Sequence, residues 1–346
     1  MIPSTGTGEA PCHHGEILQG AFRDRTGRTS LGLVTLSLPA TDALGSRAEF
    51  TPCPKAPAGR LTVHPPDRVK ALRAAASTIA ECARRSGRTP CGGRLLLRGA
   101  VPVGLGMGSS TSDIIATIRA VAAGYRVALT APEVARLAVA AEHACDPLML
   151  DDGRAPVLFA QREGRVLEVL GTALPPAVVV GCATGGGAPV DTLALPTDAY
   201  RDEDVTTYES LRGLLRRAVT TADTALLGRV CTASARLHQR LLTKEELPLL
   251  EAIAAETGAA GVQIAHSGNV AGVLFDPALP RLRPRIRRCL HRLERTGIPT
   301  TRIFTTSAST PDTENEKVST HARPRVRRDR RPRPDTPRTR TDLPAL

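Results

Sequence analysis

The sequence predicts an α+β protein made of two domains and a basic tail. Short runs typical of strands occupy the first hundred residues and lead into a glycine-rich loop that opens a helix. After residue 173 the expected order becomes strand, helix, strand, strand, helix, strand. From residue 309 prolines and arginines replace the large apolar residues that a core requires. The predicted parts are therefore residues 1–173, 174–308 and 309–346.

In the first part, strands are expected near residues 31–38, 46–51 and 94–101. A helix is expected from Ser110, because apolar residues follow at helical spacing. These residues are Ile114, Ile115, Ile118, Val121, Ala122 and Tyr125.

A second helix is expected after Thr130, which forms a capping box with Glu133. Its inner face would carry Val134, Leu137, Ala138 and Ala141. Residues 155–170 are typical of a hairpin that turns at residues 162–164.

The second part contains the elements of a split β-α-β arrangement. Strands are expected at 177–182, 261–265, 270–275 and 301–306, and helical segments at 205–241, 246–257 and 280–296. With one helix in excess, this order is that of a ferredoxin-like sheet.

The charge of the chain is concentrated at its C-terminal end. The 346 residues carry a formal net charge of +12. Residues 318–346 hold nine Arg against three Asp, which gives half of that charge, and they hold five Pro. This composition predicts a disordered, solvated extension, with an arm that binds nucleic acid as the alternative.

Cysteine spacing and the N-terminal residues indicate in which cellular compartment the protein is expected. The eight cysteines contain no C-x-x-C pair, which disfavours a zinc site or a disulfide framework. The first residues lack the basic and apolar regions of a signal peptide, and no apolar run reaches the length of a membrane span. We expect a cytoplasmic protein with reduced thiols.

The stretch "VPVGLGMGSSTSD", residues 101–113, has the composition of a phosphate-binding loop. Glycines at 104, 106 and 108 allow positive φ values and close approach of a ligand. The free N–H groups and the dipole of the helix that follows favour phosphate. Hydroxyl groups of Ser109, Ser110, Thr111 and Ser112 suit phosphate or Mg²⁺. The spacing fits neither a P-loop nor a Rossmann loop, and a simple tight connection is the alternative.

Three motifs together resemble one family. The segment "PVGLGMGSST", residues 102–111, is similar to the ATP-binding signature of the GHMP small-molecule kinases. The segments "CHHGEILQG", residues 12–20, and "VQIAHSGNVAGVLFD", residues 262–276, resemble motifs of its L-threonine kinase branch, which acts in cobalamin synthesis. The resemblance implies an N-terminal domain like the second domain of ribosomal protein S5, followed by a ferredoxin-like domain.

The resemblance also implies the cofactors ATP and Mg²⁺. The implied ATP-binding residues are Pro102, Val103, Gly104, Leu105, Gly106, Met107, Gly108, Ser109, Ser110, Thr111 and Ser112. The implied metal ligands are Ser110 and Glu142, and the implied catalytic base is Asp146.

The two acids have alternative interpretations. Glu142 could be a solvated helix end, and Asp146 could be a turn residue before a proline. Because the interval between them is shorter than in many family members, Asp151, Asp152 or no residue at all could act as the base.

Four further residues are implied as substrate-binding: Glu16, Asp113, Ser267 and Gly268. The alternatives are a structural hydrogen bond for Glu16 and a favourable first-turn charge for Asp113. His13 and His14 have no partner at ligand spacing, so surface or packing roles are expected for them. Residues 182–192 form a second glycine-rich loop, which could line the acceptor pocket or be a plain connection.

The leading hypothesis is an ATP- and Mg²⁺-dependent kinase that phosphorylates the hydroxyl group of a small metabolite, with L-threonine or a related amino alcohol as the first candidate. A non-catalytic nucleotide-binding regulatory protein is the alternative. A nucleic-acid-binding protein acting through its tail is a third, disfavoured by the lack of an aromatic platform. We expect ATP and a small hydroxyl compound as partners, with no membrane and no nucleic acid.

Overall fold

The computed structural model describes residues 3–38, 44–57, 59–99, 106–150, 155–185, 200–266 and 268–306. All of them fall in one compact unit, Met1–Ser309. The predicted tail lies outside the described residues, and a domain boundary near residue 173 stays a prediction. Within the described residues, no helix combines the length and the apolar composition needed to cross a membrane.

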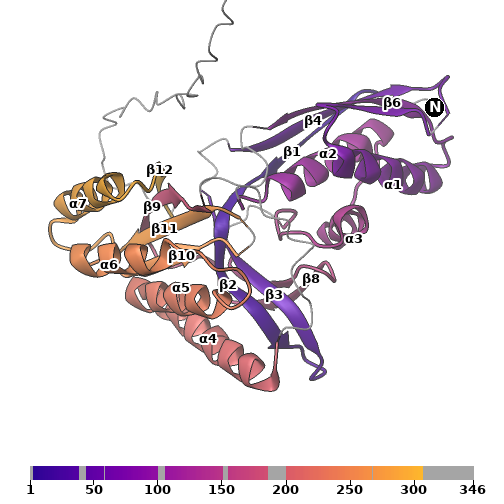
Figure 1. The fold of residues 1–346 in the computed structure, drawn as a ribbon. Helices are drawn as coiled ribbons and strands as arrows, with labels where there is room; N and C mark the ends of the chain where they lie inside the picture. The colour runs from indigo at the N-terminus through magenta and orange to yellow at the C-terminus, as the bar shows by residue number, and fades with distance from the viewer. Residues whose placement is uncertain are drawn as a thin grey trace, which may run out of the picture. The chain divides into compact units, whose positions relative to one another are not determined.

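The first sheet carries the helix that follows the glycine-rich loop. Its strands are β1 (Gly6–Pro11), β4 (Gly45–Cys53), β6 (Gly92–Gly99) and β5 (Leu61–His64), in the order β1-β4-β6-β5. Helices α1 (Val69–Ser86) and α2 (Ser109–Tyr125) lie along one face of this sheet, with α3 (Ala131–Glu142) beside them (Figure 1). Alternate residues of β1 and β4 are buried, as expected for strands with one covered face.

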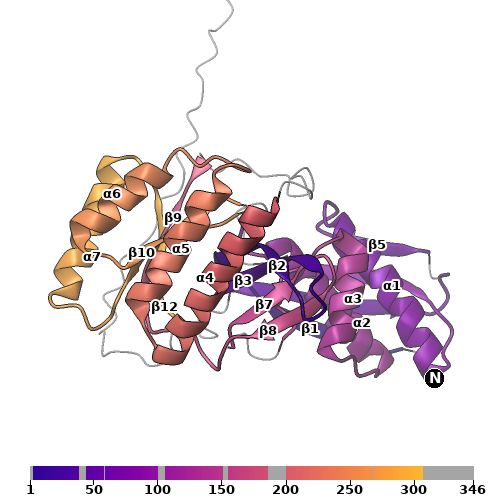
Figure 2. The ribbon, with the colours of Figure 1, turned by 90° about the horizontal axis from the view of Figure 1, so that it is seen from below.

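The second sheet has the order β2-β3-β7-β8, with every pair antiparallel. Its strands are β2 (His13–Arg23), β3 (Thr29–Ser37), β7 (Val157–Ala160) and β8 (Arg165–Val169). Helices α4 (Asp202–Thr221) and α5 (Thr224–His238) run side by side (Figure 2) and pack against β2. Tyr208 of α4 meets Phe22 of β2 edge to face, with ring centroids 5.8 Å apart.

The third sheet has the order β10-β11-β9-β12 and is antiparallel throughout. Its strands are β9 (Val178–Ala183), β10 (Gly261–Ile264), β11 (Val270–Phe275) and β12 (Thr300–Thr305). Helices α6 (Leu247–Thr257) and α7 (Leu282–Arg295) complete this part of the chain. A single apolar core joins the second and third sheets, since it includes Ile17 and Leu36 as well as Val179 and Phe304.

The predicted α+β class is confirmed, and several predicted elements appear close to their expected bounds. The capping box at the start of α3 is present, with Thr130 N donating to Glu133 Oε2 at 2.7 Å. The helical segment predicted at 205–241 is two helices, because Ala222 has a φ of 51° and Asp223 caps α5 by accepting from Leu226 N. The strands β1, β2 and β5 and the helix α1 were not expected from the sequence.

Glycines in β1 allow α2 to approach the strand closely. A Cβ atom added to Gly8 would lie 2.3 Å from Ala116 O and 2.5 Å from Ala120 N, both backbone atoms of α2. Such atoms move only if the whole helix moves, so no side chain fits at this position.

We expect Gly8→Ala to lower the free energy of unfolding by about 2 kcal/mol, because the added methyl group forces β1 and α2 apart. The matched control is Gly213→Ala in α4, where an added Cβ has no atom within 4 Å. That change should raise the free energy of unfolding by about 0.5–1 kcal/mol, because alanine favours the helix. Urea denaturation of the three proteins measures both values, and equal effects of the two substitutions would contradict the proposed packing.

Candidate active site

The first turn of α2 presents free backbone N–H groups. Gly106 and Gly108 have φ values of 76° and 68°, as the loop was expected to require. Gly108 caps α2, and Ser112 N donates to Gly108 O at 2.8 Å. The N–H groups of residues 109–111 therefore precede the first helical acceptor and are available to an anion. The predicted ATP-binding residues 102–105 lie outside the described part of the chain.

Two hydroxyl groups of this turn meet the last residue of α3. Ser110 Oγ donates to Glu142 Oε2 at 2.8 Å, and Thr111 Oγ1 donates to Glu142 Oε1 at 2.7 Å. Thr111 Oγ1 also accepts a bond from Asp146 N at 3.4 Å. The structure thus gathers Ser110, Glu142 and Asp146 around Thr111. Glu142 is buried, so the alternative of a solvated helix end is wrong.

A cation that no sequence pattern predicted lies beside Glu142. Lys70 of α1 places Nζ 3.5 Å from Glu142 Oε2. Burial raises the pKa of Glu142, while the Thr111 bond, the Lys70 charge and the Ser110 bond act in the opposite direction without cancelling it. No spacing signal pointed to Lys70, because the helix that carries it was itself unexpected.

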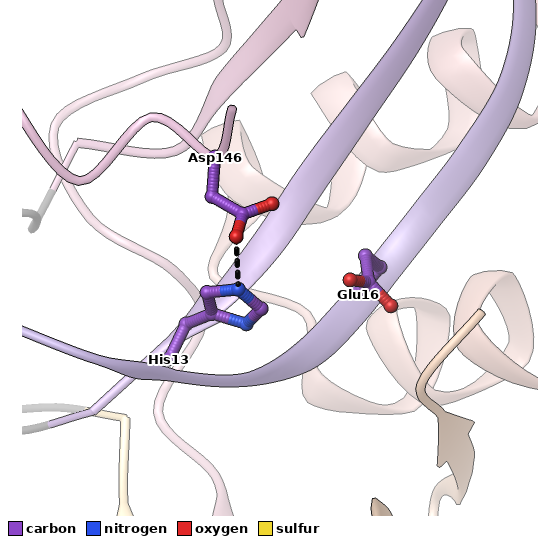
Figure 3. A group of neighbouring side chains, drawn as sticks. All are labelled: His13, Glu16 and Asp146. Carbon is purple, nitrogen blue, oxygen red and sulfur yellow. Dashed lines mark ion pairs between the residues drawn. The ribbon is translucent and has the colours of Figure 1, made fainter. Parts of the chain in front are cut away.

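Asp146 is paired with a histidine of the first motif. His13 Nε2 lies 3.1 Å from Asp146 Oδ2, and the two side chains point toward each other (Figure 3). Burial would lower the pKa of His13, but the charge and hydrogen bond of Asp146 outweigh it and raise the pKa. Burial would raise the pKa of Asp146, and the charge and hydrogen bond of His13 lower it instead. His13 is buried, so of the surface or packing roles expected for it, the buried position fits packing.

Gly108 leaves room for this pair. A Cβ atom there would lie 2.6 Å from His13 Cδ2 and 3.0 Å from Asp146 Oδ2. His13 N also donates to Met107 O at 3.2 Å, which fixes the start of β2 against the loop. The glycine therefore serves contacts within the protein as well as the turn itself.

Glu16 holds the turn of the third motif. Its Oε2 accepts a hydrogen bond from His266 N at 2.7 Å, and both residues are buried. His13, Glu16 and Asp146 each offer one atom that could bind a metal ion, a ring nitrogen or a carboxylate oxygen. These three atoms all lie within 4.8 Å of one another (Figure 3). The structural hydrogen bond considered for Glu16 is present, and a substrate role for it stays a prediction.

The third motif also contacts the glycine-rich loop. A Cβ atom on Gly106 would lie 2.6 Å from Gly268 Cα. The predicted substrate residue Gly268 therefore lies beside the loop, while Ser267 lies outside the described residues. So do Asp151 and Asp152, the alternative bases, and most of the loop at 182–192.

The next two residues of α2 face the strands. Ser112 Oγ donates to Ala10 O at 2.9 Å and accepts from Ser46 N at 2.9 Å. Asp113 Oδ1 accepts from Ser46 Oγ at 2.5 Å, and Asp113 Oδ2 lies 3.0 Å from Arg68 Nε. Burial raises the pKa of Asp113, against the lowering by the Ser46 bond and the Arg68 charge. Both carboxylate oxygens of Asp113 have partners within the protein, so these contacts do not support the predicted role of Asp113 in substrate binding.

Comparison with known proteins agrees with the motifs. Residues 70–149, which include α2, α3, Asp146 and all of α1 except its first residue, match the family described as the GHMP kinases N terminal domain. This part of the chain is similar to that family. The resemblance expected from the sequence is therefore confirmed.

An L-threonine kinase of Salmonella typhimurium is 28% identical to this chain over 188 residues. The matched region covers 53% of this chain and 60% of that relative, so the chain spans less than two thirds of the relative's length.

Solved structures of two kinases are similar to this chain in fold. The homoserine kinase of Cytophaga hutchinsonii has a TM-score of 0.60 at 15% identity, covering 89% of this chain and 96% of that one. The mevalonate kinase of L. major has a TM-score of 0.57 at 15% identity, covering 89% and 97%. At this identity the likeness concerns the fold alone.

The His13–Asp146 pair predicts a pH-dependent contribution to stability. The raised pKa of His13 stabilises the fold below its ordinary value of 6.5, and this contribution is lost as the pH rises through the folded value. The lowered pKa of Asp146 stabilises the fold above its ordinary value of 3.8, and this contribution is lost as the pH falls. Both contributions act together between these two values.

We therefore expect His13→Gln to lower the free energy of unfolding by about 3 kcal/mol at pH 5.5, with the loss becoming smaller above pH 6.5. His291→Gln, at an exposed position of α7, is the control and should change little. Urea denaturation from pH 5 to pH 9 measures the difference. A loss that stays constant over this range would count against the charged pair.

Proposed function

We propose that this chain is an ATP- and Mg²⁺-dependent kinase that transfers the γ-phosphate of ATP to the hydroxyl group of a small metabolite, with L-threonine or a related amino alcohol as the acceptor. The observation that carries the proposal is the convergence of Ser110, Glu142 and Asp146 at the start of α2. The name of the Salmonella typhimurium relative supports the choice of threonine.

The start of α2 would bind the phosphates of ATP. Backbone N–H groups of residues 109–111 and the positive end of the helix dipole favour negative charge at this point. Lys70 adds a cation on the same side, since it lies beside Glu142. Phosphoryl transfer depends mainly on such positioning and charge neutralisation.

Ser110 and Glu142 would hold the Mg²⁺ ion. A hydroxyl oxygen and a carboxylate oxygen 2.8 Å apart form a donor set that suits this hard cation, which keeps its remaining positions for water and phosphate oxygens. When bound, the ion neutralises the charge that develops on the transferred group. The raised pKa of Glu142 reflects a buried carboxylate with too little positive charge around it, which a cation would supply.

Asp146 would orient the acceptor hydroxyl and take its proton. The oxygen of that hydroxyl forms a bond to the γ-phosphorus while the bond to the bridging oxygen of ADP breaks, and the proton passes to the Asp146 carboxylate. His13 lowers the pKa of Asp146, so the carboxylate is ionised and able to accept at neutral pH. His13 is thus a positioning residue.

We infer that the first part of the chain is like the second domain of ribosomal protein S5 and that the last part is ferredoxin-like. The sheet order β10-β11-β9-β12 supports the second inference. The helix-bearing connections from β9 to β10 and from β11 to β12 each skip one strand, and β10 and β11, which no helix separates, are neighbours, as in a ferredoxin-like sheet. Glu16, Ser267 and Gly268 remain the proposed acceptor contacts.

The acceptor is tested by incubating the protein with labelled ATP, Mg²⁺ and a panel of L-threonine, homoserine, serine and 1-amino-2-propanol. Labelled phosphothreonine is the expected product. If threonine is inert and another alcohol is phosphorylated, the threonine assignment is wrong and the kinase stands. If ATP binds and no alcohol is phosphorylated, the chain is a nucleotide-binding protein without this activity.

The site is tested by Asp146→Asn, which we expect to lower kcat by about 10²- to 10⁴-fold, because a general base is lost. Ser110→Ala should instead raise the Mg²⁺ concentration that gives half-maximal rate. The control is Asp202→Asn, whose side chain is 95% exposed at the start of α4. Full turnover by Asp146→Asn, with the fold intact by circular dichroism, would exclude Asp146 as the base.

A further inference from the structure

A second polar group lies immediately after the turn of the third motif. Asn269 O accepts a hydrogen bond from Thr184 N at 2.8 Å, and Asn269 Oδ1 accepts one from Lys244 Nζ at 2.9 Å. Thr184 follows β9 and Lys244 precedes α6, so Asn269 joins three separate segments of the chain. All three residues are buried.

Lys244 lacks a close counter-charge. Its side chain is 5% exposed, and it makes no ion pair with any residue that the structure describes. Glu246 acts on Lys244 through its charge, and Glu246 Oε1 accepts a hydrogen bond from Gly185 N at 2.6 Å. Burial lowers the pKa of Lys244, and the Glu246 charge opposes this only in part. A buried ammonium group bound only to a neutral amide is unfavourable unless an anion completes the site.

The hydroxyl group of Thr184 is a second, independent sign of a missing ligand. Thr184 Oγ1 is buried and has no hydrogen-bond partner within the described residues. Buried hydroxyl groups are nearly always bonded, so an unbonded one needs an explanation. An oxygen-bearing anion would accept from this hydroxyl as well as from the ammonium group.

The position of this group links it to the proposed active site. Asn269 directly follows Gly268, and Gly268 lies against Gly106 of the glycine-rich loop. Thr184 also belongs to the second glycine-rich segment, for which the sequence analysis left a pocket role open. The group therefore borders the place where the acceptor would lie beside ATP.

We propose that Lys244, together with Thr184 and Asn269, binds an anionic oxygen group of the acceptor, either a carboxylate or a phosphate. This inference rests on the proposed function for the identity of the ligand as an acceptor. The hydroxyl group to be phosphorylated and the anion at Lys244 would fix the acceptor at two points. Neutral alcohols would then be poor substrates.

Binding can be tested without activity, because the chain has only four lysines. Protein labelled with ¹³C and ¹⁵N in lysine gives four side-chain signals by NMR, and Lys244→Met assigns one of them. Sodium acetate, inorganic phosphate, L-threonine, 1-amino-2-propanol and MgATP are added separately at constant ionic strength. The exposed Lys55 serves as the internal control.

We expect the Lys244 signal to shift in a saturable manner with L-threonine, acetate or phosphate, and not with 1-amino-2-propanol, which lacks a carboxylate. A shift with phosphate but not with the carboxylates assigns a phosphorylated acceptor. A shift with MgATP alone, or with none of the anions, overturns the proposal. These outcomes hold even if no alcohol is phosphorylated, so failure of the kinase assignment is recognised separately.

A kinetic test separates this role from a structural one. Lys244→Met should raise KM for the acceptor by about 10- to 100-fold, because a charge-assisted hydrogen bond is lost, and leave KM for MgATP unchanged. Its Tm should equal or exceed that of the unchanged protein, since an unpaired buried charge is removed. Lys244→Arg should recover part of the affinity, and Lys55→Met should change nothing. A lowered Tm with both KM values unchanged would make Lys244 structural and overturn the proposal.

Discussion

The hydroxyl group of Thr111 is the interaction on which the candidate site depends. It donates to Glu142 Oε1 and accepts from Asp146 N, so a single side chain ties the end of α3 and the following turn to the start of α2. Ser110 also bonds to Glu142, but among the hydrogen bonds of the described residues the Thr111 hydroxyl is the group of α2 that reaches both acidic residues. The same bridge explains why the short interval between Glu142 and Asp146 is compatible with a shared site. One acid closes a helix, and the other lies in the turn just beyond it.

Much of the fold could be predicted where the sequence has a strong local pattern. The capping box specified the start of α3, and continuous apolar runs specified β9 and β11, which are buried over nearly their whole length. Helix α1 was missed because nothing marks its start: no side chain caps it and its first turn has no acidic residue. Its buried face is also largely alanine, including Ala71, Ala74 and Ala75, so few large apolar residues mark it. The break between α4 and α5 was missed because Ala222 takes a left-handed conformation without a glycine or proline to mark it.

The site was predictable only as far as its motifs extend. The glycine-rich loop could be found from its own residues, and Glu142 and Asp146 were proposed from the resemblance to a family. The residues that set their electrostatics, His13 and Lys70, come from distant segments and carry no spacing signal. Lys244 is of the same kind: its burial and its neutral partner arise from three segments that meet only in the folded chain. Charge balance in a buried site is a tertiary property, so local sequence patterns do not reveal it.

The hydroxyl residues at the start of α2 divide between two tasks. Ser110 faces Glu142, whereas Ser112, two positions later, is fully engaged by Ala10 O and Ser46 N in the first sheet. Loss of the Ser112 hydroxyl would remove two hydrogen bonds to backbone groups of buried residues. A variant that loses activity at Ser112 would therefore indicate that α2 is held less firmly against its sheet, not that a group binding the substrate or the metal has been removed. The effect of alanine substitution in this turn would have to be interpreted separately for each hydroxyl group.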